Sequence, residues 1–444
     1  MSSGRPKSGW KRSVEFASPE RLHYGQSMAM KIRIHKGSHE IGGTCIELSH
    51  EGQSILLELG TPLDPESKPV DLTGFKAEAL IISHPHQDHY GRMEELAPGV
   101  PIYIGEIGRR LIDAVRIFRK REPMSREFRY IDDLKPFKVA GFTITPFLVD
   151  HSSPESFAFL VEAGGKRVFY SGDFRSHGKK GKLFDRMVKH PPKDVDVLIM
   201  EGTNIGREGS AAKTEEEIGS EIYNIIKDQK NISFLVCSGQ NIDRLTCAWK
   251  ACRDAEKTMV LDLYTAWILE QMKCKPTKVP SMEWQWMRVL FTGGQPRTIE
   301  AYPEYFGDFL NRAEKRSIDK GKLYKRPENY LSAIRLSGAK IVDAYRNRRE
   351  HPVNVIYSQW RGYLDQSRWK NSPEAEMMAG FQDDKAIEFH YAHTSGHAGF
   401  DQLKVFAEAI TARNVLPVHT EHMEDFMKYF DDVRMLGNQE WLCI

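Results

Sequence analysis

The sequence has few cysteines, and they show no pattern that forms disulfides or binds zinc. No CxxC pair occurs among the six, which are Cys45, Cys237, Cys247, Cys252, Cys274 and Cys443. This spacing excludes a zinc ribbon and a disulfide-stapled scaffold. It predicts reduced thiols buried in the core of a cytoplasmic protein.

The sequence also lacks a long apolar run and a large net charge. It contains no stretch of about 18 apolar residues and no signal-peptide core, so we expect neither a membrane span nor secretion. The 63 Lys and Arg residues almost balance the 61 Asp and Glu residues, which gives a net charge of +2. A polyanion such as nucleic acid would therefore have to bind a local basic surface.

The pattern of secondary structure changes along the chain. Residues 1–29 are polar and aperiodic, which predicts a flexible extension. Short strand patterns between Gly-rich turns predict a sandwich of sheets with outer helices over 30–204, and a similar pattern returns over 389–444. Longer amphipathic helices alternate with isolated strands over 205–388. We therefore predict one domain built from both ends of the chain, with an α/β domain inserted between them.

The segment "SHPHQDHYG", residues 83–91, directly follows the apolar run "AEALII". Alternation along an extended chain would point His84 and His86 the same way, and the loop would turn Asp88 and His89 toward a neighbouring point. Two such groups fit borderline divalent cations, zinc first and manganese second. The alternative is a His-rich surface loop without a metal.

Three further candidate ligands lie far from this segment in the sequence. They are His151 in "LVDHSSPES", Asp173 in "FYSGDFR" and His419 in "LPVHTEH", and each follows an apolar strand pattern. Taken singly, a histidine at a strand end is more often a hydrogen-bonding loop residue. Because strand ends converge on one edge of a fold, we expect the three to join the first four as ligands of two metal ions.

These motifs resemble those of a known family. "SHPHQDHYG" resembles the HxHxDH motif of the metallo-β-lactamase fold, and the surroundings of His151 and "SGDF" resemble its third and fourth motifs. The inserted region, with "LIMEGTN", "HTSGHAG" and "PVHTE", resembles the β-CASP nucleases, nearest to the ribonuclease J group. The resemblance implies an α/β fold, an αββα metallo-β-lactamase sandwich with an inserted β-CASP domain.

The resemblance also implies a ligand set. It gives a first metal to His84, His86 and His151 and a second to Asp88, His89 and His419, with Asp173 bridging both. Two Zn²⁺ per chain are expected, or Mn²⁺ in their place. One position departs from the family pattern: "SILLELG" offers Glu58 where an aspartate is usual, and this longer carboxylate could still accept a hydrogen bond from a ligand imidazole.

Catalytic roles follow from the same resemblance. With the metal ligands Asp88 and Asp173, it implies catalytic roles for Glu201, which would orient a neighbouring histidine, and for His397, which would contact the scissile phosphate and protonate the leaving 3′ oxygen. The alternative for His397 is a helix-capping residue.

We further expect a phosphate-binding group in the loop "HTSGH" and the segment "SHGKKGK", made of His393, Ser395, Lys179 and Lys180. Basic and aromatic residues in 345–351 and 359–370, including Trp360, Tyr363 and Trp369, are candidates for contact with unpaired bases. Core aromatics on solvated helices are the alternative interpretation.

The expected function is that of a cytoplasmic two-zinc ribonuclease that hydrolyses single-stranded RNA. The resemblance favours a 5′-to-3′ exonuclease with a preference for a 5′-monophosphate, and endonuclease activity stays open. Alternatives are a DNA-directed nuclease, a small-molecule metallo-hydrolase and a non-catalytic RNA-binding scaffold. The sequence leaves open a homodimer or a partner in a processing complex.

Overall fold

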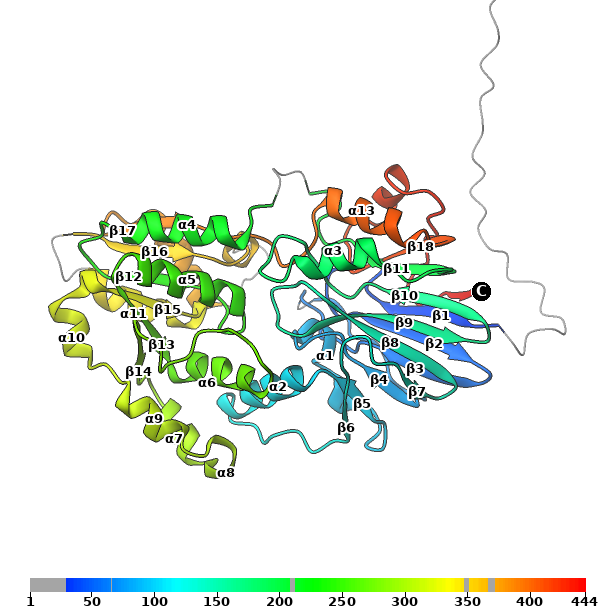
Figure 1. Ribbon diagram of the computed structural model, residues 1–444, viewed down its shortest axis with the longest axis horizontal. Coiled ribbons are helices and arrows are strands. Elements are labelled where there is room, and N and C mark those ends of the chain that lie inside the picture. Colours follow the sequence, from blue (N-terminus) through cyan, green and yellow to red (C-terminus); the bar gives the residue numbers. More distant parts are fainter. Residues whose placement is uncertain (1–28, 65, 208–211, 347–350, 366–371) are drawn as a thin grey trace, which may run out of the picture.

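The computed structural model describes residues 29–64, 66–207, 212–346, 351–365 and 372–444. These residues form three sheets with helices on their faces, and Figure 1 shows the first two sheets stacked on the right and the third on the left. The predicted extension up to residue 28 and the predicted base-contacting Trp369 lie outside the described residues.

Two sheets form the sandwich. The first contains seven strands in the order β19 (Trp441–Cys443), β1 (Lys31–Lys36), β2 (Cys45–His50), β3 (Gln53–Leu57), β4 (Ala79–Ile81), β5 (Ile102–Ile104) and β6 (Phe128–Tyr130). The second contains six in the order β18 (Asn414–Val418), β11 (Val197–Glu201), β10 (Lys166–Tyr170), β9 (Ser156–Ala163), β8 (Phe142–Val149) and β7 (Phe137–Val139). Strands from both ends of the chain thus share each sheet.

The space between these sheets is the core of the sandwich. Strand β8 alternates buried and partly exposed residues, so that Phe142 and Ile144 point inward, as expected for a half-buried antiparallel strand. They pack with Ile32 and Ile34 of β1 and with Phe157 of β9 in one apolar cluster. Burial of this cluster holds the two sheets face to face.

Helices cover the outer faces of the sandwich. Residues of α13 (Phe400–Ile410) and α3 (Lys182–Lys189) pack on the second sheet, where Phe406 stacks on Phe174 with 4.3 Å between ring centroids. On the first sheet lie α1 (Gln87–Tyr90), α2 (Glu106–Phe118) and the 3-10 turn η2 (Met93–Glu95). The predicted αββα layering is therefore confirmed.

The third sheet is entirely parallel. Its order is β14 (Met287–Leu290), β13 (Thr258–Asp262), β15 (Tyr330–Ile334), β12 (Ser233–Val236), β16 (Val353–Tyr357) and β17 (Ile387–Tyr391). The other described helices are α4 (Glu215–Ile226), α5 (Ile242–Asp254), α6 (Leu263–Gln271), α7 (Gln295–Glu300), α8 (Pro303–Phe306), α9 (Phe309–Lys315), α10 (Lys320–Lys325), α11 (Ala339–Arg346) and α12 (Pro373–Gly380). The remaining 3-10 turns are η3 (Met272–Cys274), η4 (Pro327–Asn329), η5 (Leu336–Gly338), η6 (Arg361–Leu364) and η7 (Met423–Lys428). Because all six strands are parallel, their carboxyl ends meet at one edge.

The sandwich and the inserted sheet share a core. Leu111 and Ile117 of α2 are buried in the same apolar cluster as Trp267 of α6, and Phe118 meets Tyr264 edge to face at 5.2 Å. The predicted domain boundary between residues 388 and 389 falls inside β17, which pairs with β16 as far as Tyr391. The third sheet therefore continues up to the loop that carries His393 and His397.

The cysteines are free, as predicted, but not all of them are in the core. Cys45, Cys237, Cys247 and Cys252 are buried and Cys274 is partly buried, whereas Cys443 is exposed. The prediction is wrong for Cys443 because β19, which contains it, is an edge strand of the first sheet. No helix among the described residues is long and apolar enough to cross a membrane.

Candidate metal centre

Several strands of the sandwich end at one place. The loops that follow β4, β8, β10 and β18 carry the seven predicted metal ligands, and Glu201 is the last residue of β11. The parallel register of β11 and β18 sets Glu201 level with Val418, the residue before His419. The fold thus brings together groups that are more than 300 residues apart in the sequence.

The first group of side chains is His84, His86 and His151. Nδ1 of His86 lies 3.0 Å from Nε2 of His84 and 3.3 Å from Nε2 of His151. Nδ1 of His151 donates to the carbonyl oxygen of Gly396 at 2.6 Å, and Nδ1 of His84 lies 2.9 Å from the hydroxyl of Ser83. These outer contacts leave both Nε2 atoms facing the centre as unprotonated ligands.

The second group is Asp88, His89 and His419, with Asp173 between the groups. Nε2 of His419 lies 3.3 Å from Oδ2 of Asp88. Oδ2 of Asp173 lies 3.0 Å from Nε2 of His89 and 3.8 Å from Nε2 of His84. Asp173 therefore reaches ligands of both groups, as a bridging carboxylate would.

The donor atoms of this centre fit divalent cations. Both ring nitrogens of His89 and Oδ1 of Asp173 are buried without a hydrogen-bond partner among the described residues. Leaving such atoms unpaired is costly, and a coordinated cation would satisfy them. Imidazole nitrogens combined with carboxylate oxygens are the donor set that Zn²⁺ and Mn²⁺ accept.

Glu58 lies beneath the second group. Its carboxylate accepts from the backbone N–H of Ser83 at 3.1 Å, and its Oε1 lies 3.6 Å from Nδ1 of His89. Burial raises the pKa of Glu58, and His89 and Ser83 oppose that rise. Glu58 has φ of 65° and His419 has φ of 54°, so two residues at the centre hold left-handed backbone that side chains rarely adopt.

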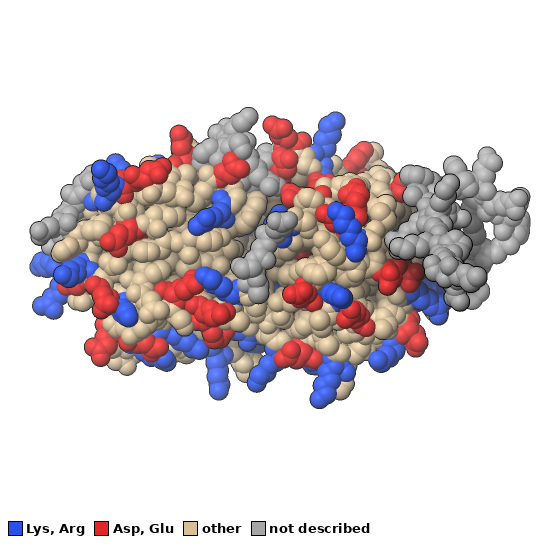
Figure 2. Space-filling view, turned by 90° about the horizontal axis from the view of Figure 1, so that it is seen from above, with Lys and Arg blue, Asp and Glu red and all other residues tan. Residues whose placement is uncertain are grey.

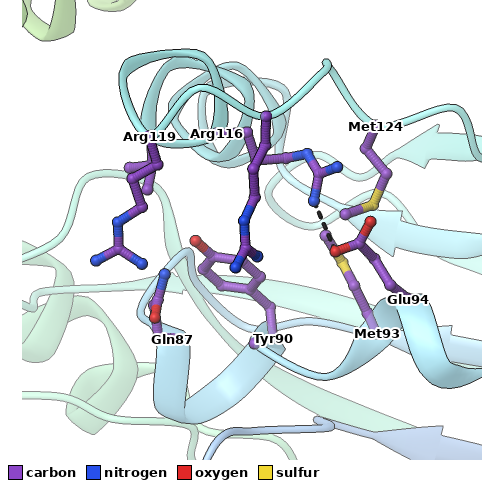
Figure 3. Close-up of a pocket in the computed structure, with 10 residues that line it drawn as sticks. Gln87, Tyr90, Met93, Glu94, Arg116, Arg119 and Met124 are labelled. Atoms are coloured by element: carbon purple, nitrogen blue, oxygen red, sulfur yellow. Dashed lines mark ion pairs between the residues drawn. The ribbon is translucent and has the colours of Figure 1, made fainter.

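Close backbone packing also fixes the "HPHQDH" loop. A Cβ at Gly60 would lie 1.6 Å from the carbonyl oxygen of Asp88, so no other residue fits there. Figure 3 shows the outer side of α1, where Tyr90 and Gln87 face Arg116 and Arg119 of the neighbouring segment. Arg116 pairs with Glu94 at 2.7 Å, and the space left between these side chains is only about 30 Å³.

His397 lies beside the two groups without belonging to either. Its Nδ1 donates to Oε2 of Glu201 at 3.0 Å, and its ring lies 5.2 Å from that of His151 and 5.5 Å from that of His419. Its side chain is 21% exposed, more than those of His84, His89, His151, Asp173 and His419, which are buried. Helix α13 is capped by Gly399, so His397 is not the capping residue.

The electrostatic environment distinguishes His397 from the histidines of the first group. Burial lowers the pKa of His397, but Glu201 and Asp173 outweigh burial and raise it to about 9. Burial lowers the pKa of His84 and His151, where neighbouring imidazoles add to the effect. The first group is therefore suited to accept a cation, and His397 to carry a proton.

Comparisons with known proteins match two segments of the chain that contribute residues to this site. The profile of a family described as "Beta-lactamase superfamily domain" matches residues 58–215, and that of a "Zn-dependent metallo-hydrolase RNA specificity domain" matches residues 386–435. Relatives named Ribonuclease J match from Sinorhizobium meliloti, 28% identical over 47% of this chain, and from Helicobacter pylori, 22% identical over 93% of it. These matches support the resemblance to the ribonuclease J group of β-CASP metallo-hydrolases.

The chain spans about half the length of the curated relatives that it matches. The matches span 40% of the S. meliloti protein and 59% of the H. pylori protein. A solved structure of a protein of unknown function from Enterococcus faecalis V583 has the same fold, with a TM-score of 0.72 and 20% identity over 94% of this chain and 100% of that one. The shared fold thus extends over nearly the whole chain, and the metallo-hydrolase family models imply a metal cofactor.

The predicted phosphate-binding group lies close to the centre, but much of it contacts the protein itself. The amine of Lys180 donates to the carbonyls of His151 and Ser153, and that of Lys179 pairs with Glu216 at 2.7 Å. The hydroxyl of Ser395 accepts from the N–H of His397. Nδ1 of His393, by contrast, is buried without a partner among the described residues. Phosphate binding by this group stays a prediction.

Of the predicted base-contacting aromatics, Trp360 and Tyr363 lie within the described residues. Their rings meet edge to face at 5.5 Å, and the guanidinium of Arg207 lies 5.4 Å from the ring of Trp360. Their contact with a nucleic acid stays a prediction.

Sequence reasoning missed Thr203 and a buried ionic cluster. The hydroxyl of Thr203 lies 2.9 Å from Nδ1 of His419 and 3.2 Å from Nδ1 of His397, so it orients both rings. The junction cluster consists of Arg175, Glu215, Asp243 and Arg244, and it joins the sandwich to α4 and α5. Nη1 of Arg175 also donates to the carbonyl of Ser395 at 3.0 Å, which fixes the loop before His397.

Proposed function

We propose that the protein hydrolyses phosphodiester bonds of single-stranded RNA with two divalent metal ions, Zn²⁺ first and Mn²⁺ as the alternative. The observation that carries this proposal is the convergence of seven candidate ligand side chains on a point beside His397, where the ring nitrogens of His89 and Oδ1 of Asp173 form no hydrogen bond with the described residues. When bound, such ions stabilise charge on the phosphate and make water a better nucleophile.

The chain's own residues would then divide the remaining work. Asp173 reaches both ligand groups and would fix their spacing. Glu201 and Thr203 hold Nδ1 of His397, which leaves its Nε2 to contact the scissile phosphate and to give a proton to the departing 3′ oxygen. Asp150, the residue before His151, accepts a hydrogen bond from the N–H of Gly178, and the amine of Lys180 donates to the carbonyl of His151. These two bonds hold the segment that carries His151.

RNA is favoured over other phosphodiesters for two reasons. The relatives that match are named Ribonuclease J, and the matching domain over residues 386–435 is described as an RNA specificity domain. That range includes His397 and His419, which lie at or beside the centre, and His393, which lies near Arg244 and Glu215 of the junction cluster. A 5′-to-3′ exonuclease mode with preference for a 5′-monophosphate is part of the proposal, and so is a cytoplasmic location, which the free thiols fit.

The test compares RNA ends and sugar type. Metal-loaded protein is given a 3′-labelled single-stranded RNA with either a 5′-monophosphate or a 5′-triphosphate, and a DNA of the same sequence. His86→Ala protein is the blank. Loss of nucleotides from the 5′ end of the monophosphate RNA is expected. Internal fragments regardless of the 5′ group would indicate an endonuclease, and DNA cleavage at the same rate would contradict the preference for RNA.

A further inference from the structure

A cavity of about 280 Å³ lies at the carboxyl ends of β13, β14 and β15. In open parallel sheets this edge is where ligands bind, because loops there can vary while the strands stay rigid. The volume is close to the lower limit for small-molecule sites, which is about 300 Å³. Apolar side chains line one wall, among them Leu261, Leu290, Ile334 and Ile341.

The polar wall of this cavity is rich in hydrogen-bond donors. It contains the hydroxyls of Thr292, Ser332 and Ser337, and the N–H groups of Gly293 and Gly294, which bond to no other described residue. Asp262 is the carboxylate of this wall, and its oxygens already accept from the N–H of Thr265, Gln295 and Arg335. The cavity therefore offers donors to an anion and an apolar wall to a flat ring.

Arg335 is one of the residues that line this cavity. Its guanidinium lies 4.5 Å from the ring of Tyr264 and donates to Asp262 at 2.9 Å, and its side chain is 38% exposed. An arginine carries several N–H donors, so one bond to Asp262 leaves others for a phosphate.

The cavity lies at the same carboxyl edge of the third sheet as the end of β17. Strand β17, which leads into the His397 loop, is three strands from β15 and four from β13. At about 4.8 Å between neighbouring strands, the end of β17 lies about 15–20 Å from the ends of β15 and β13. That equals about four to six nucleotides at the rise of about 3.4 Å per nucleotide in a stacked strand.

Side chains suited to contact with a polynucleotide lie near Arg335 and near the metal-binding loop. The hydroxyl of Tyr264 accepts from Nε2 of Gln240, in the loop after β12, at 3.2 Å. Arg119 forms no ion pair with the described residues. It lies close enough to Tyr90 and Tyr264 for its charge to oppose the rise in pKa that burial causes for both phenols. Figure 3 shows Arg119 beside Gln87 of the "HPHQDH" loop. A basic side chain thus lies near both the metal-binding loop and the aromatic ring next to Arg335.

The net charge of +2 does not explain the binding of a polyanion. On the face seen in Figure 2, Lys and Arg side chains are interspersed with Asp and Glu side chains rather than gathered in one band. Binding of a polynucleotide must therefore depend on a few individual side chains and amides at defined positions.

We propose that this cavity binds one nucleotide of the same single strand whose scissile phosphate lies at the metal centre, about four to six nucleotides away. Arg335 and the Gly293–Gly294 amides contact the phosphate, and the apolar wall contacts the base. The proposal rests on the proposed function, since it assigns a second point of contact to the same substrate.

The experiment compares a long and a short substrate. Unstructured 5′-monophosphorylated oligouridylates of 12 and 3 nucleotides are given to wild-type, Arg335→Gln and Gly294→Trp protein, and kcat and KM are measured. A Cβ at Gly294 meets no atom within 4 Å, so this position accepts a large side chain without a clash. Arg167→Gln is the matched control, because Arg167 is 32% exposed and pairs with Glu162 near the start of β10, away from the metal centre.

For both variants we expect KM for the 12-mer to rise about tenfold with kcat unchanged, and the salt dependence of binding to fall by about one unit for Arg335→Gln. KM for the 3-mer should not rise, because it cannot reach the cavity. Arg167→Gln should match wild type with both substrates. Equal rises in KM for both lengths, or no rise with either variant, would overturn the proposal.

A second measurement separates this proposal from the proposed function. Binding of the fluorescent 12-mer is followed by anisotropy, with free uridine monophosphate as competitor. If wild type cleaves neither substrate, the proposed function fails, yet weaker 12-mer binding by both variants would still support the cavity as a nucleotide site. If free nucleotide occupies the cavity and the 12-mer binds wild type and variants equally, the strand-binding proposal is wrong.

Discussion

The metal centre and the junction cluster are both buried sets of charged and polar side chains, but they are completed in different ways. In the junction cluster, both oxygens of Glu215 accept from Arg244, at 3.0 and 3.2 Å, and Oε1 also accepts from Arg175 at 3.1 Å. In the metal centre, the ring nitrogens of His89 lie 3.0 Å from Asp173 and 3.6 Å from Glu58 without forming a hydrogen bond, and Oδ1 of Asp173 accepts none from the described residues. In the junction cluster arginines face carboxylates, although Nε of Arg175 forms no hydrogen bond, whereas the metal centre gathers imidazoles and carboxylates that together fit a cation.

This difference separates stability from function. Opposite charges of the junction cluster neutralise one another, so its purpose is to hold the sandwich, α4 and α5 in one arrangement. Nitrogens and oxygens of the metal centre converge without donors between them, an arrangement that is unfavourable until a cation binds. The kind of groups that converge, rather than burial, therefore identifies the functional site.

The largest expected effect comes from removing the carboxylate that links the two ligand groups. Asp173→Asn should lower phosphodiesterase activity about 10⁴-fold, or about 5.5 kcal/mol, because the bridge between metals is lost. Metal content per chain, measured by mass spectrometry, should fall while the fold is kept. Asp185→Asn, an exposed position on α3, is the control. Activity within tenfold of wild type would remove Asp173 from the metal centre.

Breaking the junction cluster should reduce stability without reducing the affinity for metal. Glu215→Gln leaves Arg175 and Arg244 buried without their shared counter-charge, and we expect a loss of about 3–5 kcal/mol in the free energy of unfolding. Urea unfolding at pH 7 measures this loss. Glu216→Gln, at the exposed neighbouring residue, should change it by less than about 0.5 kcal/mol. A loss below about 1 kcal/mol for Glu215→Gln would mean that this cluster does not stabilise the junction.

The same carboxylate predicts a pH dependence. Burial raises the pKa of Glu215, but Arg244 and Arg175 outweigh burial and lower it to about 2, below the ordinary 4.5. A lowered folded-state pKa means that this contribution to stability is complete above about pH 4.5 and is lost as the pH falls toward 2. Acid unfolding of wild type and Glu215→Gln should therefore converge in this range. A constant difference down to pH 2 would contradict the assignment.

Removing the metal should destabilise the protein by a smaller amount. A ligand present at 100 times its dissociation constant stabilises the folded state by about 2.7 kcal/mol, so a chelator should lower the melting temperature by the corresponding few degrees. Asp173→Asn protein should respond less to the same chelator. An unchanged melting temperature for wild type would show that the unpaired atoms of the centre do not bind a cation.

The smallest expected effect concerns the hydroxyl that touches both His397 and His419. Thr203→Val keeps the shape of the side chain but removes its hydrogen bonds, and it should lower activity about 10- to 100-fold. Thr203→Ser should restore most of that loss, because it restores the hydroxyl. The ratio of the two rates at saturating RNA measures the effect, and equal rates would mean that Thr203 does not position these rings.

The contrast also explains what the sequence could predict. The sandwich, the inserted domain and the seven ligands follow from local patterns, since each ligand comes directly after an apolar strand. Arg175 and Glu215 look like ordinary surface charges in the sequence, because their partners in the junction cluster lie 29 to 68 residues away and only the fold brings them together. Thr203 carries no signal beyond its position after Glu201. The cavity beside Arg335 could not be predicted, because it arises from three strand ends and a turn.

The most direct test of this account is the anomalous scattering of crystals of the zinc-loaded protein at the zinc edge. We predict two peaks per chain, one among His84, His86 and His151 and one among Asp88, His89 and His419, with Asp173 contacting both. No comparable peak should occur in the junction cluster. An empty histidine centre in zinc-saturated crystals, with its side chains in the same positions, would contradict the claim that these converging groups mark a metal site.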